Sequence, residues 1–292
     1  MSNYLISKER INVVSSIFKT LGRDGCEEFI RIDPQYVALS KLPSLCGVIS
    51  IKLVAINSLV SYMLSVRGEE FWGLFADFAI SRCGKVRDFK EAVEAVKEFT
   101  HNYNKLYLEA KIRRLSKVLR CGNAFNSLEK GYIKEYLSKL SSCLEVEENS
   151  KTLVFSAKMA YYVLKSIGVH ADLSKIPIPV DRRVALVTLT SGLLIPPKKT
   201  KEASGRLEDL VTELLKHPEI VRKVWDVVSE ESGIPALLID APIWLIGGYV
   251  KTSGTDEIVK NLRSLGILIS ESLLTRLVSE LTLALREGLL SL

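Results

Sequence analysis

The strongest constraint on the fold is the spacing of apolar residues, which recur at helical intervals almost from end to end. Apolar side chains three and four residues apart form one face of a helix, whereas a half-buried strand needs strict alternation. The pattern predicts helices over residues 4–21, 44–65, 69–80, 88–102, 104–120, 127–142, 151–167, 182–191, 207–231, 236–250, 256–265 and 271–290. We therefore expect an all-α fold, which excludes Rossmann, P-loop and TIM-barrel architectures and their chemistry.

Length and composition favour one large globular domain or two modest ones. The chain has 292 residues, of which 47% are hydrophobic and 25% are charged, so it is neither disordered nor a small disulfide scaffold. Residues 196–206 read as a solvated loop because they are rich in Pro, Lys and Gly. We expect a single domain over 1–292, in which residues from about 253 to 292 form a C-terminal helical extension used for packing or self-association.

The cysteines and apolar segments bear on compartment and cofactors. The five cysteines are far apart and include no CxxC, which predicts reduced thiols and neither a zinc nor an iron–sulfur site. The N-terminus has no apolar core of signal-peptide length, and the apolar stretch 234–250 contains Asp240 and prolines. We expect a cytoplasmic protein with no cofactor, no metal and no membrane contact.

The segment 151–193 carries the clearest chemical signal. Its first helix is apolar almost all round, so it is expected at the centre of the molecule. Lys151 opens this helix and Lys158 lies two turns further along. Partial burial and the positive end of the helix dipole both disfavour an ammonium, so a lysine here can act as a nucleophile near neutral pH. The residues alone leave Lys151 and Lys158 as alternatives.

Asp181 is the partner expected for this amine. It follows the extended segment Pro177–Val180 and is predicted to cap the helix over 182–191, where a carboxylate stays ionised. If the two helices pack side by side, an amine and a carboxylate face one cleft. Such a pair suits attack on a sugar carbon through a cationic transition state. A surface lysine and a simple helix cap are the structural alternatives.

Several short motifs in a fixed order resemble the helix-hairpin-helix DNA glycosylase superfamily, and more closely the archaeal 8-oxoguanine DNA glycosylase family. They are DPQY (33–36), GEEFW (68–72), KTLVF (151–155), IPIPVDRRV (176–184), WD (225–226) and GIP (233–235), followed by Asp240 and Trp244. The resemblance covers roughly residues 5–250. It implies a helix-hairpin-helix glycosylase-like fold with helical lobes around a central base-binding cleft, and a catalytic hairpin and helix at about 136–191.

The resemblance also implies an activity and a set of site residues. The activity is that of a bifunctional DNA repair enzyme that excises 8-oxoguanine from double- or single-stranded DNA. The implied mechanism is lysine attack at C1′, which forms a Schiff base, followed by β-elimination of the 3′ phosphate. Such an enzyme associates with the nucleoid when bound to DNA. The implied residues are Lys151 as nucleophile, Asp181 as catalytic carboxylate, Trp72 and Phe155 as the pair that sandwiches the base, and Gln35, Asp240 and Trp244 as its hydrogen-bonding partners. Either Gln35, the single glutamine of the chain, or a backbone carbonyl is expected to read N7–H of the lesion.

The turn before Lys151 departs from the superfamily pattern. It reads Glu147-Glu148-Asn149-Ser150, whereas the hairpin is usually glycine-rich and holds a DNA phosphate by its N–H groups. An acidic turn without glycine is a poorer anion site. No cysteine follows Cys143, which excludes the iron–sulfur branch of the superfamily.

Other candidates have weaker signals. Arg113, Lys117 and Arg120 form a basic stripe fit to follow DNA phosphates, with a solvated helix face as the alternative. Arg67 is a candidate wedge for the hole left by a flipped nucleotide, and Trp225 reads as core. Two other functions stay open from the sequence: a helical nucleic-acid-binding protein without catalysis, and the same chemistry on another damaged base or an abasic site.

Overall fold

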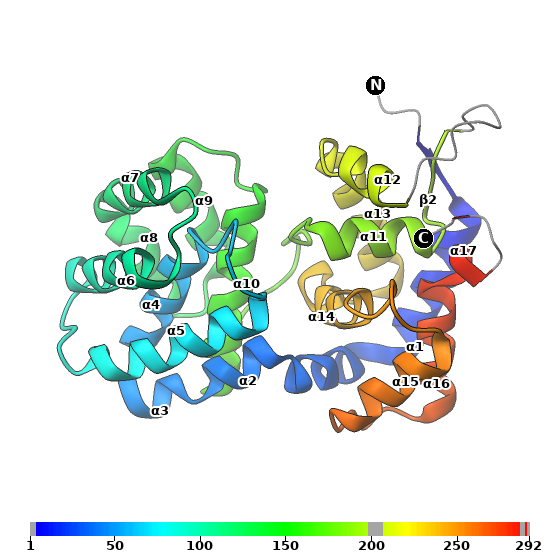
Figure 1. Ribbon diagram of the computed structural model, residues 1–292, viewed down its shortest axis with the longest axis horizontal. Coiled ribbons are helices and arrows are strands. Elements are labelled where there is room, and N and C mark those ends of the chain that lie inside the picture. Colours follow the sequence, from blue (N-terminus) through cyan, green and yellow to red (C-terminus); the bar gives the residue numbers. More distant parts are fainter. Residues whose placement is uncertain (1–3, 198–206, 287–289, 291–292) are drawn as a thin grey trace. The chain divides into compact units, whose positions relative to one another are not determined.

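The computed structural model describes residues 4–197, 207–286 and 290, and in it the chain divides into two compact units. Unit 1 comprises Met1–Ile32 and Ser174–Leu292, and unit 2 comprises Asp33–Leu173. Both units are built from helices (Figure 1). Within the described residues the strands are limited to β1 (Leu5–Ile6) and β2 (Leu194–Ile195), which pair antiparallel. The predicted all-α fold is confirmed.

Unit 2 is organised around one buried helix. Its elements are α2 (Pro34–Ser40), α3 (Leu42–Cys46), α4 (Ile49–Ser58), α5 (Gly68–Cys83), α6 (Phe89–Tyr103), α7 (Leu108–Val118), η1 (Leu119–Cys121), α8 (Gly122–Leu128), α9 (Ile133–Leu144) and α10 (Lys151–Ser166). Helix α10 packs against α4, α2 and α9, as Figure 1 shows. Every residue from Ser156 to Leu164 is buried, because an apolar surface on all sides of a helix is stable only where neighbours cover every side.

Unit 1 has a corresponding core helix. Its elements are α1 (Lys8–Ile32), α11 (Arg182–Thr190), α12 (Leu207–Leu214), α13 (Pro218–Ser232), α14 (Ala236–Gly247), α15 (Thr255–Ser264), α16 (Glu271–Leu281) and α17 (Leu283–Arg286). All of α14 is buried, and it packs against α1, α11 and α13. The apolar stretch 234–250 is therefore core. In the described part of the chain, no helix combines the length and hydropathy that a membrane span requires.

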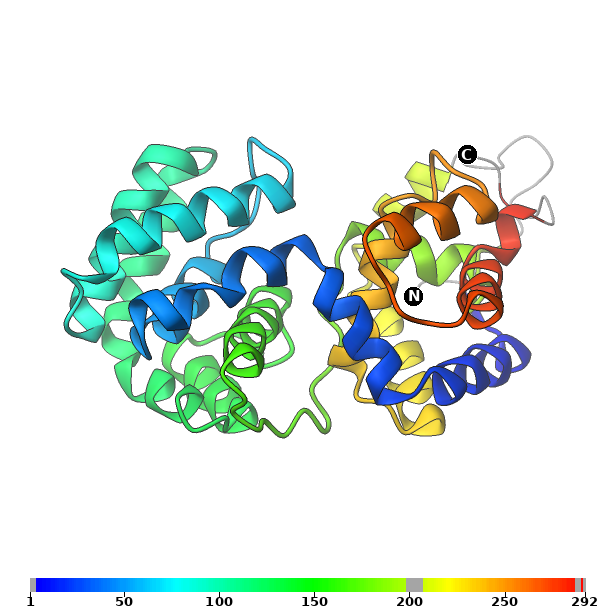
Figure 2. The same cartoon turned by 90° about the horizontal axis from the view of Figure 1, so that it is seen from below.

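Several predicted helices differ from the observed ones where glycine or proline intervenes. Helix α1 runs to residue 32 instead of 21 and bends at Gly22, whose φ of 69° lies in the left-handed region (Figure 2). The predicted helix 44–65 is divided into α3 and α4 at Gly47, which has a φ of 64°. The predicted helix 207–231 is divided before Pro218, which lacks an N–H and opens α13. Of the predicted loop 196–206, residues 198–206 lie outside the described part.

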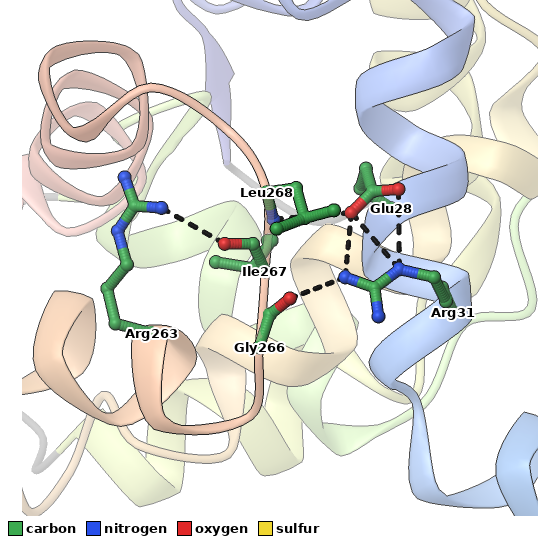
Figure 3. A network of polar contacts seen from close by, with 6 residues as sticks. All are labelled: Glu28, Arg31, Arg263, Gly266, Ile267 and Leu268. Atoms are coloured by element: carbon green, nitrogen blue, oxygen red, sulfur yellow. Dashed lines mark hydrogen bonds and ion pairs between the residues drawn. The ribbon is translucent and has the colours of Figure 1, made fainter.

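The C-terminal extension is docked onto the rest of unit 1. Helix α16 packs on α1 and α11, and the α15–α16 connection is held by the polar network of Figure 3. The Arg31 guanidinium donates to the Gly266 carbonyl, and Glu28 accepts from Arg31 and from the backbone N–H of Leu268. Arg263 donates to the Ile267 carbonyl and closes the loop on itself. The extension therefore contributes to packing within the unit.

The structure contradicts the prediction of reduced thiols. Cys46 is bonded to Cys83 and Cys121 to Cys143, with Cα–Cα distances of 5.4 and 5.8 Å, while Cys26 is a buried free thiol. These partners are 37 and 22 residues apart in the sequence, so only helix packing brings them together. Intracellular disulfides occur in hyperthermophiles, so the cysteines no longer argue for a reducing compartment.

Candidate active site

Three of the predicted base-binding residues gather in unit 2. Gln35 lies on α2, Trp72 on α5 and Phe155 on α10, and α2 packs against both of the other helices. Gln35 and Trp72 are buried, with 3% and 1% exposure, while Phe155 is half-buried. A Cβ on Gly68, one turn before Trp72, would lie 3.6 Å from the Gln35 amide nitrogen, so the Gln35 side chain reaches the first turn of α5.

The Gln35 amide has an unused acceptor. Its Oε1 atom is buried and has no hydrogen-bond partner among the described residues. A buried polar atom without a partner is costly, and such atoms in native proteins call for an explanation such as a ligand or an ordered water. The backbone N–H of Gln35 is fixed, because it donates to Asp33 Oδ1 at 2.8 Å in the N-cap of α2. This arrangement holds an unused hydrogen-bond acceptor near the first turn of α5, the helix that carries Trp72.

Trp72 and Phe155 are close to the separation that a sandwich requires. Their ring centroids are 6.2 Å apart and their planes are inclined by 54°. This distance lies in the range of about 4.5–7 Å typical of rings in direct contact, so a base could lie between them only if the rings moved apart and became parallel. Trp72 is held edge-on by Phe71 and Phe75, each with a centroid 5.6 Å away. Phe155 is the more exposed ring of the pair.

Lys151 is exposed, which contradicts the expectation that folding alone strips it of water. It is the first residue of α10 and follows a solvent-exposed turn, whereas burial of the helix begins at Leu153. Phe155 lies one turn further along α10, on nearly the same face as Lys151. The structure therefore leaves the Lys151 amine accessible at the end of the helix that carries Phe155.

Lys158, the alternative nucleophile, is held in a buried polar cluster. It is 1% exposed, and its Nζ atom lies 4.0 Å from Oδ2 of the fully buried Asp33. The same Oδ2 accepts a 2.7 Å hydrogen bond from the Tyr162 hydroxyl. Burial raises the pKa of Asp33, and the Lys158 charge and the Tyr162 hydroxyl oppose that rise. A lysine committed to this carboxylate and closed off from solvent is a poor nucleophile. In the sequence Asp33 is visible only as part of the DPQY motif, which does not indicate its pairing with Lys158.

Unit 1 contains the remaining predicted site residues. Asp181 caps α11 as predicted, because its Oδ1 accepts from the backbone N–H groups of Arg183 and Val184 at 2.8 and 2.9 Å. The Arg183 guanidinium lies 3.7 Å from the centre of the Trp244 ring. Asp240 and Trp244 follow one another by a turn on the buried helix α14. Arg183 therefore links the Asp181 cap to Trp244, a role for which the sequence offered no signal.

Close helix packing makes this link possible. A Cβ on Gly247 would lie 3.1 Å from both Arg183 Cβ and Val187 Cγ2, so a side chain at this position would crowd α11. Glycine at the end of α14 thus allows α11 to lie close enough for Arg183 to cover the Trp244 ring. Trp225 is core, as predicted: it is fully buried, and its Nε1 donates to Thr188 Oγ1 at 2.8 Å.

The basic candidates are all on the surface of unit 2. Arg113, Lys117 and Arg120 are exposed, and Arg113 forms an ion pair with Glu109 at 3.6 Å. Arg67 is the exposed residue that immediately precedes α5. Arg113 and Lys117 line one pocket, which does not include Arg120. Within the described residues no group of three or more His, Cys, Asp or Glu side chains is arranged to hold a metal ion.

Comparison with known proteins gives consistent matches. The family model described as AGOG: N-glycosylase/DNA lyase matches residues 15–276. An N-glycosylase/DNA lyase of Pyrobaculum aerophilum is 34% identical over 246 residues, which cover 80% of this chain and 86% of the relative. An N-glycosylase/DNA lyase of Aeropyrum pernix is 29% identical over 252 residues, covering 82% and 83%. The crystal structure of the Pyrobaculum aerophilum 8-oxoguanine DNA glycosylase complexed with 8-oxoguanosine matches with a TM-score of 0.72 and 28% identity, covering 94% of this chain and 97% of that one.

Proposed function

Because the chain belongs to the AGOG family of N-glycosylase/DNA lyases, we propose that it excises 8-oxoguanine from DNA and cleaves the strand with Lys151 as the nucleophile. The observation that carries this proposal is the grouping of Gln35, Trp72 and Phe155 in unit 2, with the accessible Lys151 one turn from Phe155 on α10. A flipped base needs stacking surfaces and polar partners for its edges, and this group provides both.

Lesion recognition is assigned to the unused Gln35 acceptor. Guanine presents an acceptor at N7, whereas 8-oxoguanine presents an N–H donor there. The Gln35 Oε1 atom has no partner among the described residues, so it can accept the N7–H of the lesion. With guanine in the pocket, two acceptors would face one another and both would lose their hydrogen bonds. The cost of such unsatisfied groups supports discrimination between the two bases.

The proposed covalent step begins at C1′ of the lesion nucleotide. The neutral Lys151 amine forms a bond to C1′ while the C1′–N9 bond breaks; the base leaves with that electron pair and takes up a proton equivalent to the one the amine loses. Opening of the sugar ring gives a Schiff base between Lys151 and C1′. Removal of a C2′ proton then expels the 3′ phosphate with the C3′–O electron pair. Water hydrolyses the Schiff base and releases the amine.

Removal of water from Lys151 is assigned to the bound DNA. Because Lys151 is exposed in the free protein, docking of a strand over the first turn of α10 would exclude solvent from its amine. Loss of water and the helix N-terminus both disfavour the ammonium form, and the proposal requires these two effects to outweigh the attraction of the DNA phosphates for the ammonium. In this account the nucleophile is activated only when substrate is present.

Asp181 is proposed as the carboxylate that stabilises positive charge on the sugar. Both cap hydrogen bonds go to Oδ1, so an Asp181→Asn variant keeps an oxygen for the cap and loses only the charge. We expect this variant to fold normally, to bind DNA, and to excise the base more slowly in single-turnover assays. An unchanged excision rate would remove Asp181 from the mechanism.

Borohydride trapping tests the proposal. Wild-type protein with a labelled duplex containing 8-oxoguanine should give a covalent adduct on reduction, and the same duplex with guanine should not. Lys151→Gln should abolish the adduct. Lys90→Gln is the matched control, because Lys90 is an exposed lysine in the first turn of another unit 2 helix. A normal adduct yield from Lys151→Gln, or no base release by the wild-type protein, would contradict the assignment.

The same assay distinguishes the alternatives. A nucleic-acid-binding protein without catalysis would bind both duplexes and release no base. An enzyme directed to another lesion would release that base, or cleave an abasic site, while leaving 8-oxoguanine in place. Single-stranded and double-stranded versions of the same oligonucleotide establish which form of DNA is the substrate.

A further inference from the structure

A second candidate site on unit 2 shares no residue with the group assigned to base recognition. It is a pocket of about 340 Å³ formed by α7, the segment after α4 and the end of α9 with the turn that follows. Helix α7 packs on α6 and α9, as seen in Figure 1. The pocket is lined by Tyr62, Arg113, Arg114, Lys117, Leu144 and Val146. Three cations from one helix thus share a small space.

Arg114 is the cation with the least compensation. Its Nη2 donates to Thr152 Oγ1 at 2.6 Å, while its buried Nε has no hydrogen-bond partner among the described residues. Among the described residues, Arg114 forms no ion pair with a carboxylate. Burial lowers the pKa of Arg114, because the guanidinium has lost water without gaining a counter-ion. An anion in the pocket would compensate the Arg114 charge.

Lys111 is a second poorly compensated charge, and it lies next to the ring of Tyr62, which lines the pocket. It is fully buried, and its ammonium donates to Asn104 Oδ1 at 2.5 Å and lies 5.0 Å from the centre of the Tyr62 ring. These partners are neutral, so they do not cancel the charge. The ion pair of Arg113 with Glu109 is highly exposed, and such pairs contribute little. The charged side chains that line the pocket are therefore all positive.

We propose that this pocket binds one backbone phosphate of DNA, gripped by the guanidinium groups of Arg113 and Arg114 and by the Lys117 ammonium. The proposal rests on the proposed function for its ligand. Thr152, which binds Arg114, directly follows Lys151, so a phosphate held here fixes the strand beside the first turn of α10. The turn over residues 145–150 has three glutamates, and it is a poor anion site itself. The positive charge on α7 replaces it.

Salt dependence of binding provides the first test. The double variant Arg113→Gln/Lys117→Gln changes two exposed side chains, so its unfolding midpoint should equal that of the wild type. For an 8-oxoguanine duplex and for an undamaged one, the slope of log K against log salt should become shallower by about one, the value for a single phosphate contact. Arg120→Gln is the matched control, because it removes a charge from the same stripe outside the pocket. An unchanged slope in the double variant would overturn the proposal.

A phosphate scan provides the second test. Duplexes in which one phosphate at a time is replaced by a neutral methylphosphonate should bind the wild type more weakly at one position. At that position the double variant should lose nothing further, while Arg120→Gln should still lose affinity. Equal losses in the wild type and the double variant, or an Arg120→Gln variant insensitive at the same phosphate, would overturn the site. Because binding to undamaged DNA needs no base release, failure of the pocket is distinguishable from failure of the proposed enzyme activity.

Discussion

The buried pair of Lys158 and Asp33 gives a prediction that separates the two candidate nucleophiles. The atoms Lys158 Nζ and Asp33 Oδ2 are 4.0 Å apart and neither side chain is exposed beyond 1%. At an effective dielectric constant of 20, the attraction over this distance is about 4 kcal/mol. Replacing Lys158 by Met keeps the length and apolar stem of the side chain but leaves the Asp33 carboxylate buried without its cation. We expect Lys158→Met to lower the free energy of unfolding by about 3–5 kcal/mol.

The assay is denaturant unfolding at pH 7 of the wild type, Lys158→Met, Asp33→Asn and the double variant. Asp33→Asn keeps an oxygen for the cap of α2, and its Nδ2 takes the place of Oδ2, where it donates to the Tyr162 hydroxyl oxygen instead of accepting from it. Because the double variant has no unpaired charge, it should recover most of the stability lost by Lys158→Met. A loss below about 1 kcal/mol in Lys158→Met, or a double variant in which the single losses simply add, would refute the reasoning.

The Lys158→Met variant also has a pH signature and a catalytic one. Without Lys158, the pKa of Asp33 in the folded protein rises further above its unfolded value, so the folded state binds the proton more tightly than the unfolded chain does. The stability deficit should therefore be smallest near pH 4 and should grow as pH rises, until the folded pKa is passed. Borohydride trapping should persist in this variant, because the Lys151 amine is untouched.

Three further predictions concern other parts of unit 2. Burial lowers the pKa of Lys111 to about 8. Between about pH 8 and 10 the unfolded chain therefore binds this proton more tightly than the folded protein does, and the stability of the wild type should rise with pH. The Lys111→Met variant should lack this rise. Cys121→Ser removes the disulfide between cysteines 22 residues apart and should lower the free energy of unfolding by about 3 kcal/mol. Thiol titration of the unfolded wild type should give one reactive cysteine, and a count of five would contradict both disulfides. Trp72→Ala should cost about 3–5 kcal/mol of stability and slow excision in single-turnover assays, whereas a stable variant with normal excision would remove this ring from both roles.

The core helices could be predicted because their residue types indicate that they are buried. Apolar residues on every side of 151–167 and 236–247 leave no polar face for solvent, so both helices are central in their units. Helix ends were less well predicted, since a single glycine such as Gly47 decides whether two turns continue or separate. Proline 218 was visible in the sequence and still did not divide the predicted helix.

Properties that depend on tertiary partners could not be predicted. The disulfide partners, the Asp33 carboxylate beside Lys158 and the Arg183 guanidinium on Trp244 all join segments far apart in the sequence. The exposure of Lys151 differs from the prediction because burial of α10 begins only at Leu153. The grouping of Gln35, Trp72 and Phe155 followed only from the resemblance, since nothing in their local spacing places α2, α5 and α10 together.

The most direct test of the account is to locate the covalent bond itself. The borohydride-reduced adduct with an 8-oxoguanine duplex should be digested with nuclease and protease, and the modified peptide sequenced by mass spectrometry. The account predicts a sugar-phosphate remnant on the Nζ atom of Lys151, in the peptide that opens α10. A remnant on Lys158, or on any other amine of the chain, would contradict it.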